Sequence, residues 1–151
     1  TLFRLCHYLK ERKSLRVITN SLPVVAELLH LQNIRVSLVG GEVVGERQAV
    51  YGTMAERMIG EHHADKAFIG ADGLSLKNGL SSFDEKEAGV TRRMAESADR
   101  VYLLCDSSKI ERDSYVRFAS LDLFQVLITD RRLSRPVRDR YRRKGIEIIS
   151  G

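Results

Sequence analysis

Residues 15–39 read LRVITNSLPVVAELLHLQNIRVSLV, and this stretch decides the fold class. Two short runs rich in β-branched residues, 15–19 and 34–39, flank a segment whose apolar residues recur at helical spacing. Asn20 or Ser21 can cap that helix. A strand, a helix and a second strand in this order are typical of a parallel sheet with helices packed on its faces.

The same alternation continues to the end of the chain. Further strands are expected over residues 66–69, 100–105, 125–129 and 147–149, where short apolar runs lack polar alternation. Helices are expected over residues 1–11, over residues 54–62, and from Asp84 or Glu85 through Ala98. We therefore predict an α/β domain with a mostly parallel sheet and helices on both faces.

The bulk composition suits one soluble domain of 151 residues, because 43% hydrophobic residues can bury a sizeable core. No apolar run approaches the roughly 18 to 20 residues of a membrane span, and no secretory signal is visible, so we expect a cytoplasmic protein without membrane contact. Cys6 and Cys105 are expected to be buried, reduced thiols. No metal-ligand spacing is present, and no cofactor or metal is expected.

The net charge of +5 raises the question of nucleic-acid binding. Much of the basic excess falls between Arg131 and Lys144, around the apolar residues Val137 and Tyr141. This pattern favours an amphipathic helix with a solvated basic face over a direct contact to a phosphate backbone.

Three polar or glycine-rich loops follow predicted strands. In open parallel sheets ligands bind beyond the carboxyl ends of the strands, so we expect these loops to converge. Their residues are Asn20, Ser21, Gly40, Gly41, Asp72 and Gly73. A further polar cluster, Asp106, Ser107, Ser108 and Lys109, follows the strand expected over residues 100–105 and could bind a phosphorylated polyhydroxyl compound.

Each loop allows a ligand-binding and a purely structural interpretation. Asp72 can accept hydrogen bonds from a polyol, while Lys77 or Lys109 can contact an anionic group. Asp84 and Glu85 can cap the next helix or face the same crevice. The structural alternatives are helix capping at residues 20–21, a plain turn at residues 40–41 and an Asx turn at residues 106–109.

Five segments carry a family resemblance that spans nearly the whole chain. They resemble successive blocks of the sensor domain of the DeoR family of bacterial transcriptional repressors. They read VITNSLPVVAELL, VSLVGGEV, DKAFIGADGLSLKNGLSSFDEKEAGVTRRM, VYLLCDSSKI and LDLFQVLITD.

The resemblance implies a fold like that of ribose-5-phosphate isomerase and glucosamine-6-phosphate deaminase. Residues 1–151 would form an effector-binding domain that takes up a phosphorylated sugar or polyol without turning it over. The effector would modulate operator binding by an N-terminal winged helix-turn-helix, which this sequence lacks, so that the chain would contact DNA only through that missing part. The regulated genes would serve carbohydrate metabolism.

The resemblance also implies roles for particular residues. Ligand contacts are expected at Asn20, Ser21, Gly40, Gly41, Asp72, Gly73, Lys77, Asp84, Glu85, Asp106, Ser107, Ser108 and Lys109. The family's first sensor strand and most of its Asp-x-Gly-Thr-Thr loop would precede this sequence, with Thr1 as the last residue of that loop. We expect a homo-oligomer, a dimer or tetramer, with a contact region at Val43, Val44, Val50 and Tyr51.

The alternative is a sugar-phosphate isomerase or deaminase of the same fold, in which Asp72, Lys77 and Glu85 would act on the substrate. Against it, Asp72 is followed by Gly73-Leu74-Ser75, where isomerases that resemble this fold carry another acidic residue. We therefore expect a sensor without catalytic residues.

Overall fold

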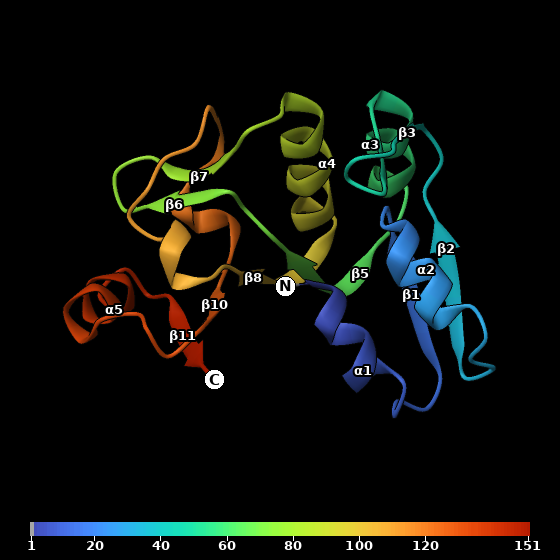
Figure 1. Ribbon diagram of the computed structural model, residues 1–151, viewed down its shortest axis with the longest axis horizontal. Helices are drawn as coiled ribbons and strands as arrows, with labels where there is room; N and C mark the ends of the chain where they lie inside the picture. Colours follow the sequence, from blue (N-terminus) through green and yellow to red (C-terminus); the bar gives the residue numbers. More distant parts are fainter. Residues whose placement is uncertain (1) are drawn as a thin grey trace.

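A computed structural model describes residues 2–151 and shows an α/β fold around a central parallel sheet (Figure 1). The sheet contains four strands in the order β11-β10-β8-β5, and each neighbouring pair is parallel. The strands are β5 (Ala64–Ile69), β8 (Ala98–Leu104), β10 (Val126–Thr129) and β11 (Glu147–Ser150). The predicted fold class is confirmed, whereas the prediction for Thr1 falls outside the described residues.

A second parallel pair lies beside this sheet. Strands β1 (Leu15–Thr19) and β2 (Ile34–Leu38) are joined by helix α2 (Leu22–Leu28), which is the predicted strand-helix-strand unit. Within residues 2–151, β1 pairs only with β2 and β5 pairs only with β8. The parallel strands thus form two separate groups.

Five further strands are antiparallel and were not predicted. Strands β3 (Glu42–Val44) and β4 (Ala49–Tyr51) form a hairpin. Strands β6 (Gly73–Ser75), β7 (Gly79–Ser82) and β9 (Val116–Ala119) form a three-stranded sheet. Each of the five is three or four residues long, which is too short for a clear hydrophobic period.

The helices expected from the sequence match the predicted positions more closely than the predicted lengths. They are η1 (Leu2–Arg4) with α1 (Leu5–Leu9), α3 (Thr53–Gly60), α4 (Glu85–Glu96) and α5 (Arg135–Arg142). Two short 3₁₀ helices, η2 (Ser107–Lys109) and η3 (Leu121–Leu123), were not predicted. Helix α4 stops before the predicted end at Ala98, because Ala98 already pairs with Ala64 as the first residue of β8. None of the helices formed by residues 2–151 combines the length and the apolar character that crossing a membrane requires.

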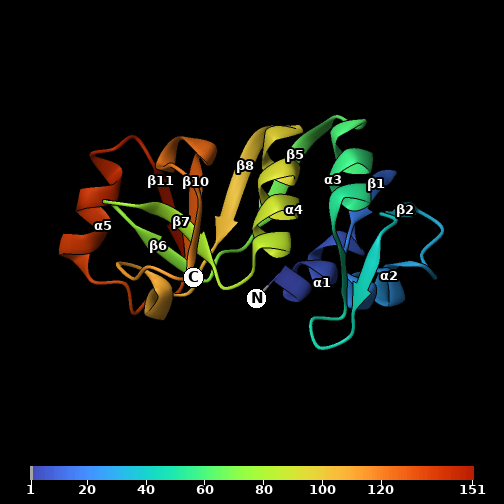
Figure 2. The ribbon, with the colours of Figure 1, turned by 90° about the horizontal axis from the view of Figure 1, so that it is seen from above.

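Helix α4 lies between two apolar cores. Ala95 packs into the larger core with Leu103 and Leu127 of the central sheet, whereas Val90 packs into a second core that contains Ile59 of α3. Figure 2 shows α3 and α4 side by side along the sheet. A third core joins α1 and α2 to the β1–β2 pair.

Several predictions about burial can be compared with these cores. Cys6 and Cys105 are free and buried, as predicted, and burial raises the pKa of Cys105 to about 12. Val50 and Tyr51 are buried inside the second core, so the prediction that they contact another subunit is wrong. They are buried because their strand, β4, packs against α3 instead of facing solvent.

Helix α5 confirms the amphipathic pattern of the basic segment. Tyr141 is fully buried, Val137 packs against the larger core, and the side chains of Arg135 and Arg142 are exposed. The hydroxyl of Tyr141 donates to Oε1 of Glu111 at 2.7 Å. Burial raises the pKa of Tyr141, so the hydroxyl keeps its proton and remains a donor.

We predict that Tyr141→Phe lowers the free energy of unfolding by about 1.5 to 3 kcal/mol, because it removes a hydrogen bond to a charged acceptor. Urea denaturation at neutral pH measures this loss. Tyr115→Phe is the matched control, since Tyr115 is 83% exposed and should leave the midpoint unchanged. Equal midpoints for the two variants would contradict the prediction.

Candidate functional site

Asp72 and Lys109 form the centre of a candidate site at the carboxyl ends of β5 and β8. Nζ of Lys109 lies 3.2 Å from Oδ1 of Asp72 and also donates to the carbonyl oxygen of Ala71 at 3.3 Å. The side chain of Asp72 is 12% exposed. The two residues come from loops that are far apart in sequence, and the structure brings them together because both loops follow the carboxyl ends of neighbouring parallel strands.

The other oxygen of Asp72 is held by the segment that leads into α4. Oδ2 accepts from the backbone N–H of Phe83 at 3.2 Å and lies 3.4 Å from the hydroxyl of Ser82. Asp72 precedes β6 and Ser82 ends β7, so both residues stand at the open end of this hairpin. The carboxylate is therefore fixed from two sides.

Glu87 adds a second carboxylate to the site from the first turn of α4. Its Oε2 atom is buried and has no hydrogen-bond partner within the part of the chain that the structure describes. The nearest cation is Arg47, whose Nη2 lies 3.6 Å away, beyond hydrogen-bonding distance. A buried carboxylate oxygen without a donor is costly, so this atom is an acceptor that a ligand could satisfy.

The charges around Glu87 define the extent of the site. Burial raises the pKa of Glu87. The positive charges of Arg47 and Lys109 lower this pKa, whereas the negative charges of Asp72 and Asp84 raise it further. The pKa of Tyr51 is raised to about 12, first by burial and then by Glu87. We call Asp72, Ser82, Glu87 and Lys109, together with Arg47 and Tyr51, the strand-end site.

Asn20 is connected to the strand-end site by hydrogen bonds to Val50 of β4. The side-chain Nδ2 of Asn20 donates to the carbonyl oxygen of Val50 at 3.2 Å. The backbone carbonyl oxygen of Asn20 accepts from the N–H of Val50 at 2.8 Å. Ser21 caps α2, accepting from the N–H of Val24 at 3.4 Å. The loop after β1 is thus joined to the strand that carries Tyr51.

The predicted glycines have different surroundings. Gly41 has a φ of +146°, and a Cβ there would lie 2.6 Å from the carbonyl oxygen of Tyr51, so the position needs glycine for packing. A Cβ on Gly73 would lie 2.5 Å from Oγ of Ser81. Gly40 is exposed and has open space where a Cβ would stand, so of the three only Gly40 leaves room for a ligand.

The polar groups of residues 106–108 are already engaged in hydrogen bonds within their own turn and to Asp130. The carboxylate of Asp106 accepts from the N–H of Ser108 at 3.1 Å and caps η2. The N–H and hydroxyl of Ser107 both donate to Asp130, at 2.8 and 2.9 Å. Of the residues 106–109, Lys109 is the one that contacts Asp72.

Three other predicted residues lie around or away from the strand-end site. Asp84 is the N-cap of α4 and accepts from the N–H of Glu87 at 2.9 Å, while Glu85 is exposed. Lys77 stands in the turn between β6 and β7, at the opposite end of that hairpin from Asp72. There it lines a separate cavity of about 380 Å³ with Arg117 and Lys144.

Sequence reasoning missed Glu87, Arg47, Ser82 and Tyr51. A signal for Glu87 existed, because Val90 and Met94 follow it at i+3 and i+7 and therefore share its helix face. Arg47 gave no comparable signal, since it lies in a hairpin loop that only the tertiary structure places beside α4.

Comparisons with known proteins agree with this architecture. A family model described as the DeoR C terminal sensor domain matches residues 1–131. The chain is 33% identical over 133 residues to the HTH-type transcriptional repressor GlcR of Bacillus subtilis, covering 88% of this chain and 51% of that protein. It is 34% identical over 134 residues to the HTH-type transcriptional regulator GlpR of Haloferax volcanii, covering 89% and 52%.

A third relative is the glycerol-3-phosphate regulon repressor of Escherichia coli K12, which is 28% identical over 124 residues, covering 82% of this chain and 49% of the relative. The chain therefore spans about half the length of the curated relatives that it matches. The relatives are transcriptional regulators by name, and the match covers the strands and loops that build the strand-end site.

We predict that Glu87→Gln stabilises the protein relative to the wild type more at about pH 7 than at about pH 4. The folded protein holds the pKa of Glu87 above its usual value of 4.5, so the wild type loses stability as the pH rises from that value through the raised one. Glutamine cannot ionise and has no such loss. Thermal unfolding across this pH range measures the difference.

Glu85→Gln is the control for this experiment, because it removes the same charge from the same helical turn at an exposed position. The thermal unfolding midpoint of Glu85→Gln should change with pH in parallel with that of the wild type. A Glu87→Gln curve that runs parallel to the wild-type curve would refute the raised pKa of the half-buried Glu87.

Proposed function

The chain belongs to the DeoR family, as a C-terminal sensor domain, and we propose that it binds a phosphorylated sugar or polyol that changes the operator affinity of the intact regulator. The DNA-binding part would lie in the half of the regulator that this chain does not span. Such a regulator would act in the cytoplasm, as a dimer or tetramer.

The observation that carries the proposal is the orphan carboxylate oxygen of Glu87 beside the Asp72–Lys109 pair. Among residues 2–151, Oε2 of Glu87 is buried and finds no donor, and an effector hydroxyl would supply one. Asp72 offers a second acceptor, while Lys109 and Arg47 can contact a phosphate group. Carboxylates and cations side by side suit a ligand that carries both hydroxyl groups and a phosphate.

The relatives support the same ligand class. One of them is named for the glycerol-3-phosphate regulon, and glycerol 3-phosphate is a phosphorylated polyol. Asn20, Ser21 and Gly40 stand at the ends of neighbouring parallel strands and would complete the effector contacts. The other predicted residues of these loops would hold the site in shape through the turns, caps and packing contacts described above.

The β3–β4 hairpin is suited to transmit binding to the rest of the regulator. Asn20 bonds Val50 at one side of this hairpin, and Glu87 and Lys86 of α4 pair with Arg47 and Glu42 at the other. An effector that engages Glu87 would change the attraction on Arg47 and so the position of the hairpin. A coupling of about 1 to 3 kcal/mol would alter DNA affinity roughly 5- to 150-fold.

Enzymatic turnover is the competing function, because a carboxyl group of raised pKa beside a second carboxylate can also move protons. Glu87 would then take the role that sequence reasoning gave to Glu85. Each compound that binds is therefore also assayed for product formation, and turnover would replace the sensor proposal by an isomerase or deaminase.

We predict that a thermal-shift screen against phosphorylated sugars and polyols finds a compound that stabilises the protein saturably and is not consumed. Lys109→Gln should weaken its binding by about tenfold, the equivalent of about 1.4 kcal/mol, because a charge-assisted hydrogen bond to phosphate is lost. Lys77→Gln is the matched control and should bind as the wild type does, since Lys77 lines a different cavity.

If Lys109→Gln binds the compound as tightly as the wild type does, the effector is not bound at the strand-end site. If no phosphorylated compound stabilises the protein, the same screen on the intact regulator decides the question. A second negative result would refute the proposed ligand class.

A further inference from the structure

We propose that a second anion site, selective for a phosphate group, lies at the amino-terminal ends of β1 and β2. A cavity of about 350 Å³ is found there, lined by Ser14, Leu15, Arg16, Gln32, Asn33 and Arg35. The strand-end site lies at the carboxyl ends of β5 and β8 in the central sheet, whereas this cavity lies at the amino-terminal ends of the separate β1–β2 pair. The two sites share no residue, so the second does not depend on the first.

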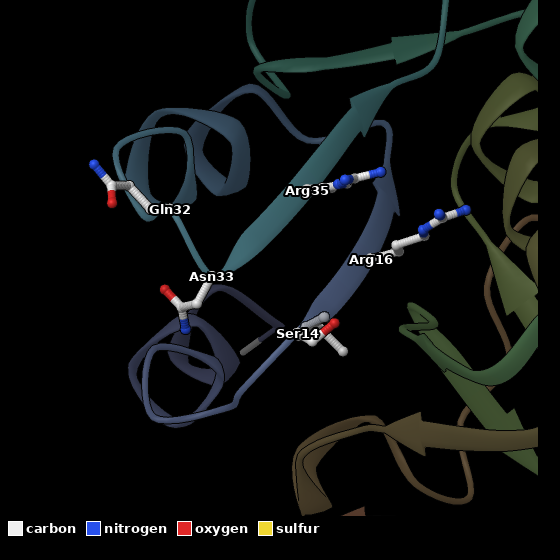
Figure 3. A pocket seen from close by; sticks show the side chains of 6 residues that line it. Ser14, Arg16, Gln32, Asn33 and Arg35 are labelled. Carbon is white, nitrogen blue, oxygen red and sulfur yellow. The ribbon is translucent and has the colours of Figure 1, made fainter.

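The cavity is built around two arginines in register. Arg16 of β1 pairs directly with Arg35 of β2, so in this parallel pair their side chains share one face. Figure 3 shows both side chains leaving the strands on the same side, whereas Gln32 points away from them. Two guanidinium groups are thereby presented together.

Neither guanidinium is neutralised within residues 2–151. The ion pairs among these residues include neither Arg16 nor Arg35, and the residues that line the cavity include no acidic side chain. Like charges directly opposite each other on neighbouring strands repel each other and destabilise the sheet. An anion between the two groups would remove this repulsion.

Asn33, which also lines the cavity, is held by the end of the opening helical segment. The amide Nδ2 of Asn33 donates to the carbonyl oxygen of Lys10 at 3.3 Å and also to that of Arg12. These bonds fix the loop before β2 against the loop before β1, and the latter loop carries the exposed cations Arg12 and Lys13. This part of the frame of the cavity is therefore preformed.

The chemistry of the cavity selects a phosphate group. A guanidinium is a planar fork that matches phosphate oxygens two at a time, and two forks on one face can share a single phosphate. A volume of about 350 Å³ is near the lower limit for ligand pockets, which suits a compact anion. The phosphate could belong to a small metabolite or to a nucleic-acid backbone.

We predict that inorganic phosphate causes saturable shifts of the backbone NMR signals of Ser14, Arg16 and Arg35 in the 151-residue chain. In the double variant Arg16→Gln, Arg35→Gln these shifts should require at least about tenfold more phosphate, because both charge-assisted contacts to the phosphate oxygens are lost. The free spectrum of the variant verifies its fold, which is expected to persist since both side chains are exposed.

The matched control is Arg131→Gln, Arg132→Gln, which removes two adjacent exposed arginines elsewhere and should bind phosphate as the wild type does. Equal phosphate affinity for the two double variants would overturn the proposal, as would shifts confined to the strand-end site.

A second titration with a short DNA duplex of unrelated sequence identifies the source of the phosphate. If the duplex shifts the same signals and competes with inorganic phosphate, the site takes a nucleic-acid backbone, and the binding weakens steeply with salt. If only inorganic phosphate shifts them, the site takes a small phosphorylated metabolite.

Discussion

The parallel arrangement of the central strands is the constraint on which the rest of the structure depends. Strands that all run in one direction need crossover segments between them, and every strand then ends at the same edge of the sheet. Asp72 and Lys109 follow the neighbouring strands β5 and β8, and they are 3.2 Å apart although 37 residues separate them in the chain. The chemistry of the site is a consequence of this topology.

Helix α4 connects the stability of the domain to its site. Val90 and Ala95 anchor the helix in two different cores, so its first turn is fixed relative to both the sheet and α3. This rigidity holds Glu87 with one oxygen buried and without a donor. A free surface carboxylate would turn toward water, whereas this one is kept ready for a ligand because packing elsewhere in the helix determines its position.

Charge is distributed unevenly between the carboxyl ends of the central strands and the amino-terminal ends of β1 and β2. At the carboxyl ends, carboxylates and cations alternate around Asp72 and Glu87, which suits a ligand that carries hydroxyl groups as well as phosphate. At the amino-terminal ends of β1 and β2, two guanidinium groups that form no ion pair with the described residues 2–151 face the same side. The basic residues of α5 are instead a solvated face above the buried Tyr141. The net charge of +5 alone does not distinguish these arrangements.

The sequence by itself determined the fold class, the order of the six parallel strands along the chain and the positions of Asp72 and Lys109 beyond the ends of two of them, because hydrophobic periodicity is a local property. It did not determine the short antiparallel strands, the separation of β1–β2 from the central sheet, or the place of Arg47 beside Glu87. The sequence analysis also named Glu85 instead of Glu87 as a ligand contact, although Glu85 is exposed. It grouped Lys77 with Asp72, whereas the structure places Lys77 in a different cavity. Only the tertiary structure decided these points, since which side of a helix is buried and which end of a hairpin faces a site depend on contacts between segments far apart in the chain.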